Sequence, residues 1–142
     1  MVQLTRLDRY NWESCLSISL LPEQETYVPS ILFSLAQASF EAVKPLGIMY
    51  RGKMIGLLIH GEFSGICWIS RILIDKDYQG RGLGTEAIQQ MIKRLAIHPS
   101  CREIRTSYVK ENQAAQAFFE KLGFEPIPGE IGQEVVAVYV GE

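Results

Sequence analysis

Three glycines at alternating positions, within residues 77–84 (DYQGRGLG), constrain the fold of this chain most strongly. They follow the apolar run ICWISRILI (66–74) and precede a stretch in which apolar residues recur every three or four positions (83–95). The first pattern predicts a buried central strand and the second an amphipathic helix. The chain is therefore expected to pass from a strand into a helix through a loop with few side chains.

The start of such a helix is suited to binding an anion. Its first N–H groups have no partner within the helix, and the helix dipole adds positive potential. Glycines let an anion approach several of these N–H groups together. We therefore expect a phosphate or a diphosphate here, with Arg81 adding a charged contact. A tight turn that only allows close helix–strand packing would explain one glycine well and three poorly.

Two other phosphate-binding patterns do not match this loop. The dinucleotide fingerprint G-x-G-x-x-G requires a third glycine where this chain has Thr85. The P-loop pattern G-x-x-x-x-G-K-[ST] is absent. The pattern that remains is Gln-x-x-Gly-x-Gly, formed by Gln79, Gly82 and Gly84.

The rest of the chain predicts a single domain over residues 1–142, with no internal repeat or linker. Alternating or apolar runs indicate further strands at 2–7, 46–50, 54–60, 103–109, 124–128 and 134–140. Helical patterns lie near 11–20, 30–43 and 112–122, with Asn112 as the cap of the last one. This order predicts a mixed α/β sheet with helices on both faces.

The composition excludes several classes of binding partner. The formal net charge of −2 provides no basic field for nucleic acid, and no apolar run reaches the length of a membrane span. Three cysteines without C-x-x-C spacing argue against a disulfide framework or a zinc site and for a reducing compartment. His60 and His98 are isolated, so we expect no metal. We interpret the protein as cytoplasmic.

Two stretches together resemble the GNAT superfamily of acyl-CoA-dependent N-acetyltransferases. One is ISRILIDKDYQGRGLGTEAIQQMIKRL (69–95), and the other is ENQAAQAFFEKLGFE (111–125). The segment LPEQETYVPSILFSLAQASFE (21–41) is similar to the spermine/spermidine acetyltransferases of bacteria. The resemblance implies a mostly antiparallel twisted sheet of about six or seven strands. It also implies acetyl-CoA as co-substrate and a small-molecule amine, most of all a polyamine, attacking directly in a ternary complex. Relatives are often dimers, which leaves a homodimer open.

The resemblance also assigns cofactor-binding residues. The backbone of residues 72–74 would pair with the pantetheine arm, and one of its N–H groups would polarise the thioester carbonyl. The loop and the helix start would hold the diphosphate, and the last helix would contact the cofactor from the other side. The residues so assigned are Ile72, Leu73, Ile74, Gln79, Gly80, Arg81, Gly82, Leu83, Gly84, Thr85, Asn112, Ala115 and Phe119.

The chemistry requires a proton acceptor, because a primary amine with a pKa near 10.4 is only about one part in 10³ neutral at pH 7. In some relatives a glutamate lies where this chain has Trp68. The remaining candidates for the base are Glu62 and then Glu25 and Glu23. These carboxylates also suit a cationic polyamine, and Tyr27 and Trp68 could stack on its chain.

The group that protonates the departing thiolate is open. Many relatives carry tyrosine at the position of Phe119, which has no proton to give. Tyr108 or water would then serve, or the thiolate would leave unassisted. Other acceptors stay open as well: a protein N-terminus, a lysine or an aminoglycoside. The non-enzymatic alternative is a module that binds acyl-CoA without catalysing a reaction.

Overall fold

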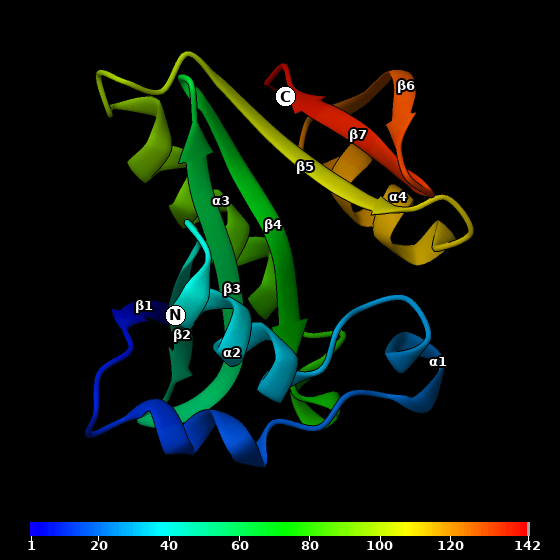
Figure 1. Ribbon diagram of the computed structural model, residues 1–142. Coiled ribbons are helices and arrows are strands. Elements are labelled where there is room, and N and C mark those ends of the chain that lie inside the picture. Colours follow the sequence, from blue (N-terminus) through cyan, green and yellow to red (C-terminus); the bar gives the residue numbers. More distant parts are fainter. Residues whose placement is uncertain (142) are drawn as a thin grey trace.

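The computed structural model describes residues 1–141 as one seven-stranded sheet with helices on both faces (Figure 1). The strands are β1 (Val2–Arg6), β2 (Lys44–Tyr50), β3 (Lys53–Phe63), β4 (Ile66–Ile74), β5 (Glu103–Val109), β6 (Phe124–Ile131) and β7 (Glu134–Tyr139). The helices are α1 (Pro22–Glu25), α2 (Ile31–Phe40), α3 (Leu83–Ala96) and α4 (Gln113–Lys121), with short 3₁₀ turns η1 (Trp12–Ser17) and η2 (Lys76–Tyr78).

The order of strands in the sheet is β1-β2-β3-β4-β5-β7-β6. Five of the six neighbouring pairs are antiparallel, and β4 and β5 form the parallel pair in the middle. A parallel connection needs a crossover, and α3 provides it. The predicted mostly antiparallel sheet with helices on both faces is confirmed.

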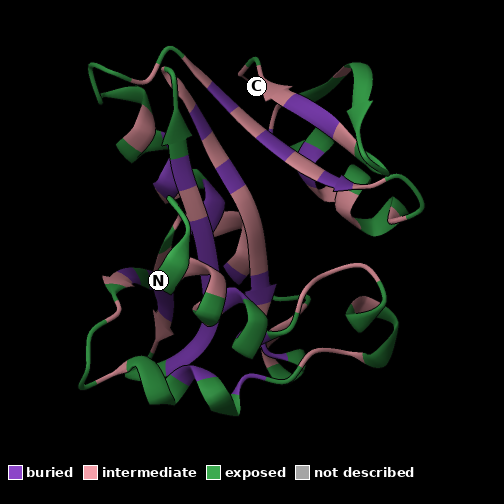
Figure 2. Cartoon of the chain, in the orientation of Figure 1, coloured by how far each residue is buried: buried purple, intermediate pink, exposed green. Residues whose placement is uncertain are grey.

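Two apolar cores cover the two faces of the sheet. One lies under α3 and α4 and includes Ile88, Leu58 and Phe119. The other lies under η1 and α2 and includes Cys15 and Leu57. Neighbouring residues of β3 thus belong to opposite cores, as the alternation of side chains along a strand requires. Figure 2 shows the buried residues concentrated in the central strands, whereas α1 is largely exposed.

The element boundaries match the sequence predictions closely, with differences near the N-terminus. The predicted helix near 11–20 is only the short turn η1, and Pro22 begins α1 instead of merely ending the preceding run. A proline fits the first turn of a helix because that position needs no N–H donor. The cap of α2 is Ser30, whose Oγ accepts the N–H of Phe33 at 3.0 Å.

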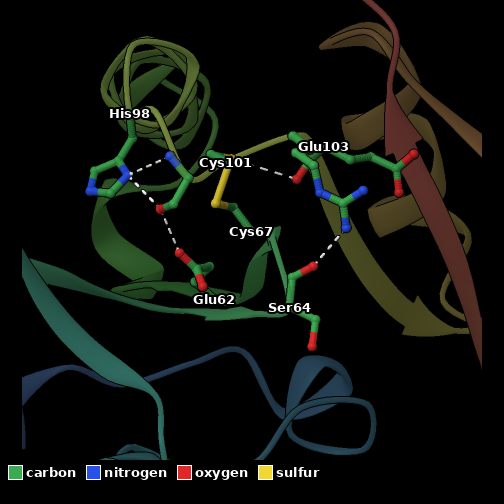
Figure 3. Close-up of a disulfide and its surroundings, with 8 residues drawn as sticks. Glu62, Ser64, Cys67, His98, Cys101 and Glu103 are labelled. Carbon is green, nitrogen blue, oxygen red and sulfur yellow. Dashed lines mark hydrogen bonds between the residues drawn. A yellow bond between two sulfur atoms is a disulfide. The ribbon is translucent and has the colours of Figure 1, made fainter.

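The cysteines correct one prediction. Cys67 and Cys101 form a disulfide (Figure 3), whereas the sequence predicted no disulfide. Their Cα atoms lie 5.7 Å apart, within the usual range for a bridge, because β4 runs beside the segment that enters β5. The 34 residues between them hide this proximity in the sequence. The cysteines therefore no longer support the inference of a reducing compartment. Cys15 remains a buried free thiol.

No helix within residues 1–141 has both the length and the apolar character needed to cross a membrane.

Candidate active site

The two central strands separate partway along their length. Ile66–Ile69 of β4 pair with residues 103–106 of β5, and beyond Thr106 β5 pairs only with β7. Figure 1 shows the two arrows starting together and diverging toward their C-terminal ends. The backbone of residues 70–74 is consequently left without a neighbouring strand on this side. We call this opening the fork.

Two local features produce the fork. The pairing of β3 with β4 skips Ser70, since Ile59 lies opposite Arg71 and His60 lies opposite Ile69. Such a bulge bends its strand and increases its twist, which carries the end of β4 away from β5. At the branch point the buried Thr106 hydroxyl donates to the Ile69 carbonyl at 2.8 Å. This side-chain bond takes the place of the next ladder bond.

A cavity of about 770 Å³ fills the fork and continues to the start of α3. Its walls come from the end of β4, the glycine loop with the start of α3, the end of β5 with α4, the start of β7, and the segment around α1. The residues assigned by the GNAT resemblance that line it are Ile72, Leu73, Ile74, Gln79, Gly80, Gly82, Leu83, Gly84, Thr85, Asn112, Ala115 and Phe119. The structure therefore gathers residues from two distant motifs into one space.

The glycine loop has the conformation that glycine permits most easily. Gly80 and Gly82 have φ values of +74° and +78°, so a side chain at either position would be strained. Gly84 has no such requirement, and an added Cβ there would only touch Phe118 and Ile74 at ordinary distances. Backbone geometry thus explains two of the three glycines. Gly84 is the one whose missing side chain leaves room in the cavity.

The helix start is open toward this space. Gly82 is the N-cap of α3 and has no side chain to cap it, and the first bond closing the helix runs from Glu86 to the Gly82 carbonyl. The N–H groups of Leu83, Gly84 and Thr85 precede that bond and line the cavity. They can hold the two charges of a diphosphate without a further protein group.

Gln79 and Arg81 both make hydrogen bonds to the protein, and of the two only Gln79 lines the cavity. Arg81 is outside the cavity: its Nη2 donates to the Asp77 carbonyl at 3.0 Å, and its guanidinium lies 5.1 Å from the Tyr78 ring centre. Gln79 lines the cavity, but its amide is engaged by the protein. Its Nε2 donates to the Ile74 carbonyl at 2.8 Å and to Oε1 of Gln24 at 2.8 Å. The backbone of the loop, more than these side chains, is available to an anion.

The opposite wall is aromatic. Asn112 caps α4 by accepting the N–H of Ala115 at 3.2 Å, which confirms its predicted capping role. Phe119 lies parallel to Tyr108, with ring centres 6.1 Å apart. The Tyr108 hydroxyl is buried and has no hydrogen-bond partner among residues 1–141. Burial raises the pKa of this phenol, and the negative charge of Glu120 raises it further. Tyr108 therefore keeps its proton at neutral pH.

The remaining wall carries two opposite charges. Arg71 is half-buried and donates from Nη1 to the buried Ser34 Oγ at 3.0 Å. Burial lowers the pKa of Arg71, while the charges of Glu134 and Glu41 raise it. Glu134 lines the cavity and accepts from the Ser107 hydroxyl at 3.1 Å. Within residues 1–141, Glu134 is the only carboxylate among the cavity-lining side chains.

Glu62 and Trp68, which the sequence predicted at the acceptor side, do not line this cavity. Glu62 is opposite Cys67 at the closed end of the β3–β4 pair, and Figure 3 shows it beside the disulfide. Its Oε1 accepts from the Ser100 hydroxyl at 2.7 Å. Trp68 belongs to the paired part of β4 and contacts the Arg105 guanidinium, 5.9 Å from its ring centre. Neither the predicted role of Glu62 as the base nor the predicted stacking of Trp68 on the acceptor gains support from these positions.

The segment before α2 contributes to the cavity wall. Tyr27 lines the cavity, and Gln24 does so from α1. Glu23 and Glu25 flank Gln24 on this helix but are exposed and do not line the cavity.

Sequence reasoning missed Thr106, Ser70, Arg71 and Glu134. They are polar residues of three different strands, and none of them belongs to a recognisable motif. Their shared location depends on which strands pair and where pairing stops. The polar pair Ser70–Arg71 inside an apolar run was the available signal.

Comparison with known proteins agrees with this geometry. The model of the "Acetyltransferase (GNAT) family" matches residues 7–124. The spermine/spermidine N(1)-acetyltransferase of Bacillus subtilis (strain 168) is 29% identical over 124 residues, covering 81% of this chain and 82% of that protein. An aminoglycoside N(6′)-acetyltransferase type 1 of Klebsiella pneumoniae is 31% identical over 120 residues, or 75% of this chain and 57% of that protein.

Solved structures share the fold. The structure of AAC(6′)-Ib in complex with parmomycin and acetyl-CoA superposes with a TM-score of 0.78 at 20% identity, covering 96% of this chain and 91% of that one. The matched family model spans both signature motifs and the fork between them. This chain belongs to the GNAT family of acetyltransferases, whose acetyl donor is acetyl-CoA.

Proposed function

We propose that this enzyme transfers an acetyl group from acetyl-CoA to a primary amine of a polyamine such as spermidine or spermine. One observation carries the proposal: a single cavity joins the open start of α3, the unpaired edge of β4 and a carboxylate on β7. These are the three parts that an anionic thioester donor and a cationic amine acceptor require. The direct attack of the amine in a ternary complex fits a cavity with room on both sides of β4.

The donor side would be held mainly by backbone. The N–H groups of Leu83, Gly84 and Thr85 would bind the diphosphate at the start of α3. The unpaired backbone of Ile72–Ile74 would bind the pantetheine arm as an added strand. Acetyl-CoA supplies an already activated thioester, so correct placement of the amine can provide much of the rate.

Glu134 replaces Glu62 as the proposed proton acceptor. It reaches the cavity from the start of β7, and the Ser107 hydroxyl orients its carboxylate. Deprotonating the acceptor ammonium costs roughly 4–5 kcal/mol at pH 7, and a positioned carboxylate can accept that proton. The opposite charge on Arg71 balances Glu134 while the acceptor is absent.

Tyr108 is the proposed proton donor to the departing sulfur. Tyr108 lines the cavity beside Phe119, the position that lacks a hydroxyl, and its own hydroxyl is buried without a hydrogen-bond partner among residues 1–141. A buried hydroxyl without a hydrogen bond is unfavourable, and such groups in folded proteins call for an explanation. A role toward a substrate atom provides one.

The polyamine assignment rests on the similarity to the Bacillus enzyme and on the exposed carboxylates of α1. Glu23 and Glu25 would attract the distal ammonium groups of a polyamine, and Tyr27 would contact its chain. A cation over an aromatic ring contributes about 0.5–1 kcal/mol at an exposed site.

A panel of acceptors tests this proposal. Purified enzyme would be mixed with acetyl-CoA and with spermidine, spermine, an aminoglycoside or a lysine peptide, and the free thiol followed. The expected result is the highest kcat/KM with a polyamine, and a large loss in Glu134→Gln. The similarity to the Klebsiella enzyme makes an aminoglycoside the second candidate. Thiol release with none of these amines would contradict an amine acetyltransferase and favour a module that only binds acyl-CoA.

A further inference from the structure

The segment that forms the acceptor-side wall is tied to the glycine loop by a few polar contacts. We call residues 19–29, which contain α1, the strap. At its beginning, the Ser19 N–H donates to Asp75 Oδ1 at 2.8 Å, and the Lys76 N–H donates to the Ser19 carbonyl at 2.7 Å. Asp75 is buried, so this end is firmly attached. Beyond Ser19 the strap carries Tyr27, Val28 and Pro29 along the cavity.

A reciprocal amide pair fixes the middle of the strap. Gln24 Nε2 donates to Gln79 Oε1 at 2.9 Å, and Gln79 Nε2 donates back to Gln24 Oε1 at 2.8 Å. Gln24 Oε1 also accepts the Leu21 N–H at 3.1 Å, which caps α1. Gln79 Nε2 also holds the Ile74 carbonyl. Among the described residues, this pair provides the only hydrogen bonds between residues 20–29 and the rest of the protein.

Gln79 consequently has two connections. Its backbone belongs to the loop expected to hold the diphosphate, and its side chain reaches both the end of β4 and the strap. A ligand that orders this loop also orders the Gln79 amide, and with it Gln24. Apolar packing holds the strap at Leu20 and Val28, which flank α1, whereas the four residues of α1 cannot form a stable helix alone.

We propose that Gln24 is a positioning residue that couples the two substrate sites. Through its amide pair with Gln79, binding of CoA at the glycine loop orders the strap and so completes the acceptor wall. This inference rests on the proposed function, because it takes the glycine loop as the CoA site. Coupling of this kind is reciprocal, so a bound acceptor would strengthen CoA binding by the same factor.

Hydrogen–deuterium exchange tests the coupling without knowledge of the acceptor. Wild-type protein is compared with and without CoA, and exchange is followed in peptides covering 79–85 and 19–29. CoA should slow exchange in both. In Gln24→Leu, which removes the amide pair at similar volume, protection should persist at 79–85 and disappear at 19–29. Gln24→Glu can still accept from Leu21 and Gln79, so it should retain part of the strap protection.

The matched control is Gln116→Leu, which removes an exposed amide bond to Glu120 on α4 outside the cavity. It should behave like the wild type. Two results would overturn the inference. One is CoA-dependent protection of the strap in Gln24→Leu equal to that of the wild type. The other is wild-type protein in which CoA slows exchange at 79–85 but not in the strap. Protection in neither peptide would instead show that CoA does not bind this loop, which overturns the proposed function and the inference together.

Kinetics with spermidine as the probe give a second measurement. Gln24→Leu should raise the KM for spermidine roughly tenfold, the effect expected for losing one to two neutral hydrogen bonds. Bound spermidine should lower the Kd of CoA, measured by calorimetry, in the wild type and should have no such effect in Gln24→Leu. A variant that lost kcat and CoA affinity together, with an unchanged KM for spermidine, would indicate a purely structural role for Gln24 and refute the coupling.

Discussion

Replacing Tyr108 by phenylalanine should change stability and activity in opposite directions. The substitution removes one hydroxyl, which is buried in the fork without a hydrogen-bond partner among residues 1–141. A buried unsatisfied polar group costs about 1–3 kcal/mol. The stacking of this ring on Phe119 does not depend on the hydroxyl, so it is retained. Tyr108→Phe should therefore be more stable than the wild type by about 1 kcal/mol, or roughly 3–4 °C in Tm at this chain length.

The activity of Tyr108→Phe should fall. A positioned general acid contributes about 10²–10⁴-fold in rate. A thiol with a pKa near 8.5 needs this help less than a poorer leaving group. We therefore expect a loss in kcat of about 10- to 100-fold, with an unchanged Kd for CoA. Because the pKa of Tyr108 is raised, wild-type kcat should show no alkaline decline from this group below its ordinary pKa near 10.

The assay pairs thermal unfolding with thiol release over a pH series. Tyr139→Phe is the matched control, because Tyr139 is a half-buried tyrosine on β7 that does not line the cavity. It should keep the wild-type kcat. A Tyr108→Phe protein that is less stable would show that the hydroxyl has a partner in the folded state. An unchanged kcat would show that it gives no proton to the leaving group.

Three predictions concern the fold. The buried Cys15 thiol has its pKa raised from 9.0 to about 11, so stability should fall by up to about 3 kcal/mol as pH rises from 9 to 11, at about 1.4 kcal/mol per unit. Urea unfolding of Cys15→Ala should lack this decline. Burial lowers the pKa of His60, with further lowering by Lys44 and Arg94, so the unfolded chain binds a proton first. Stability should decrease as pH falls below about 6.5, and a His60→Gln variant that shows the same decrease would refute this. Thr106→Val leaves a buried β4 carbonyl without its donor and should cost about 1–3 kcal/mol in urea unfolding, whereas no loss would mean that the branch point needs no such bond.

The fold was predictable largely because its signals are local. The apolar run 66–74 is a strand with those bounds, and the helix stripe that begins at Leu83 is α3. Each boundary follows from a cap, a glycine or a change of period within a few residues. The two motifs assigned to the cofactor are also contiguous in the sequence, and residues of both line one cavity.

The acceptor side depends on contacts between distant residues. Glu62 was a reasonable choice for the base because a turn connects its strand to β4, yet that turn is at the closed end of the pair. Glu134 is remote in sequence but reaches the fork because β7 pairs with β5. Alternation along a strand says which face a residue occupies and nothing about where two strands separate. The disulfide between Cys67 and Cys101 was hidden for the same reason.

Arg81 shows that the sequence does not predict the direction of a long side chain in this loop. The sequence places it inside the glycine loop, and its charge suggests a phosphate contact. In the structure, its guanidinium instead contacts the Asp77 carbonyl and the Tyr78 ring. A long side chain next to two glycines has many directions available, and local pattern does not choose among them.

A crystal structure of the protein grown with CoA tests the central claim most directly. The account predicts the pantetheine arm along residues 72–74 within the fork and the diphosphate on the N–H groups of Leu83, Gly84 and Thr85. CoA bound at another surface, with the fork filled by side chains or by β5 pairing fully with β4, would contradict it.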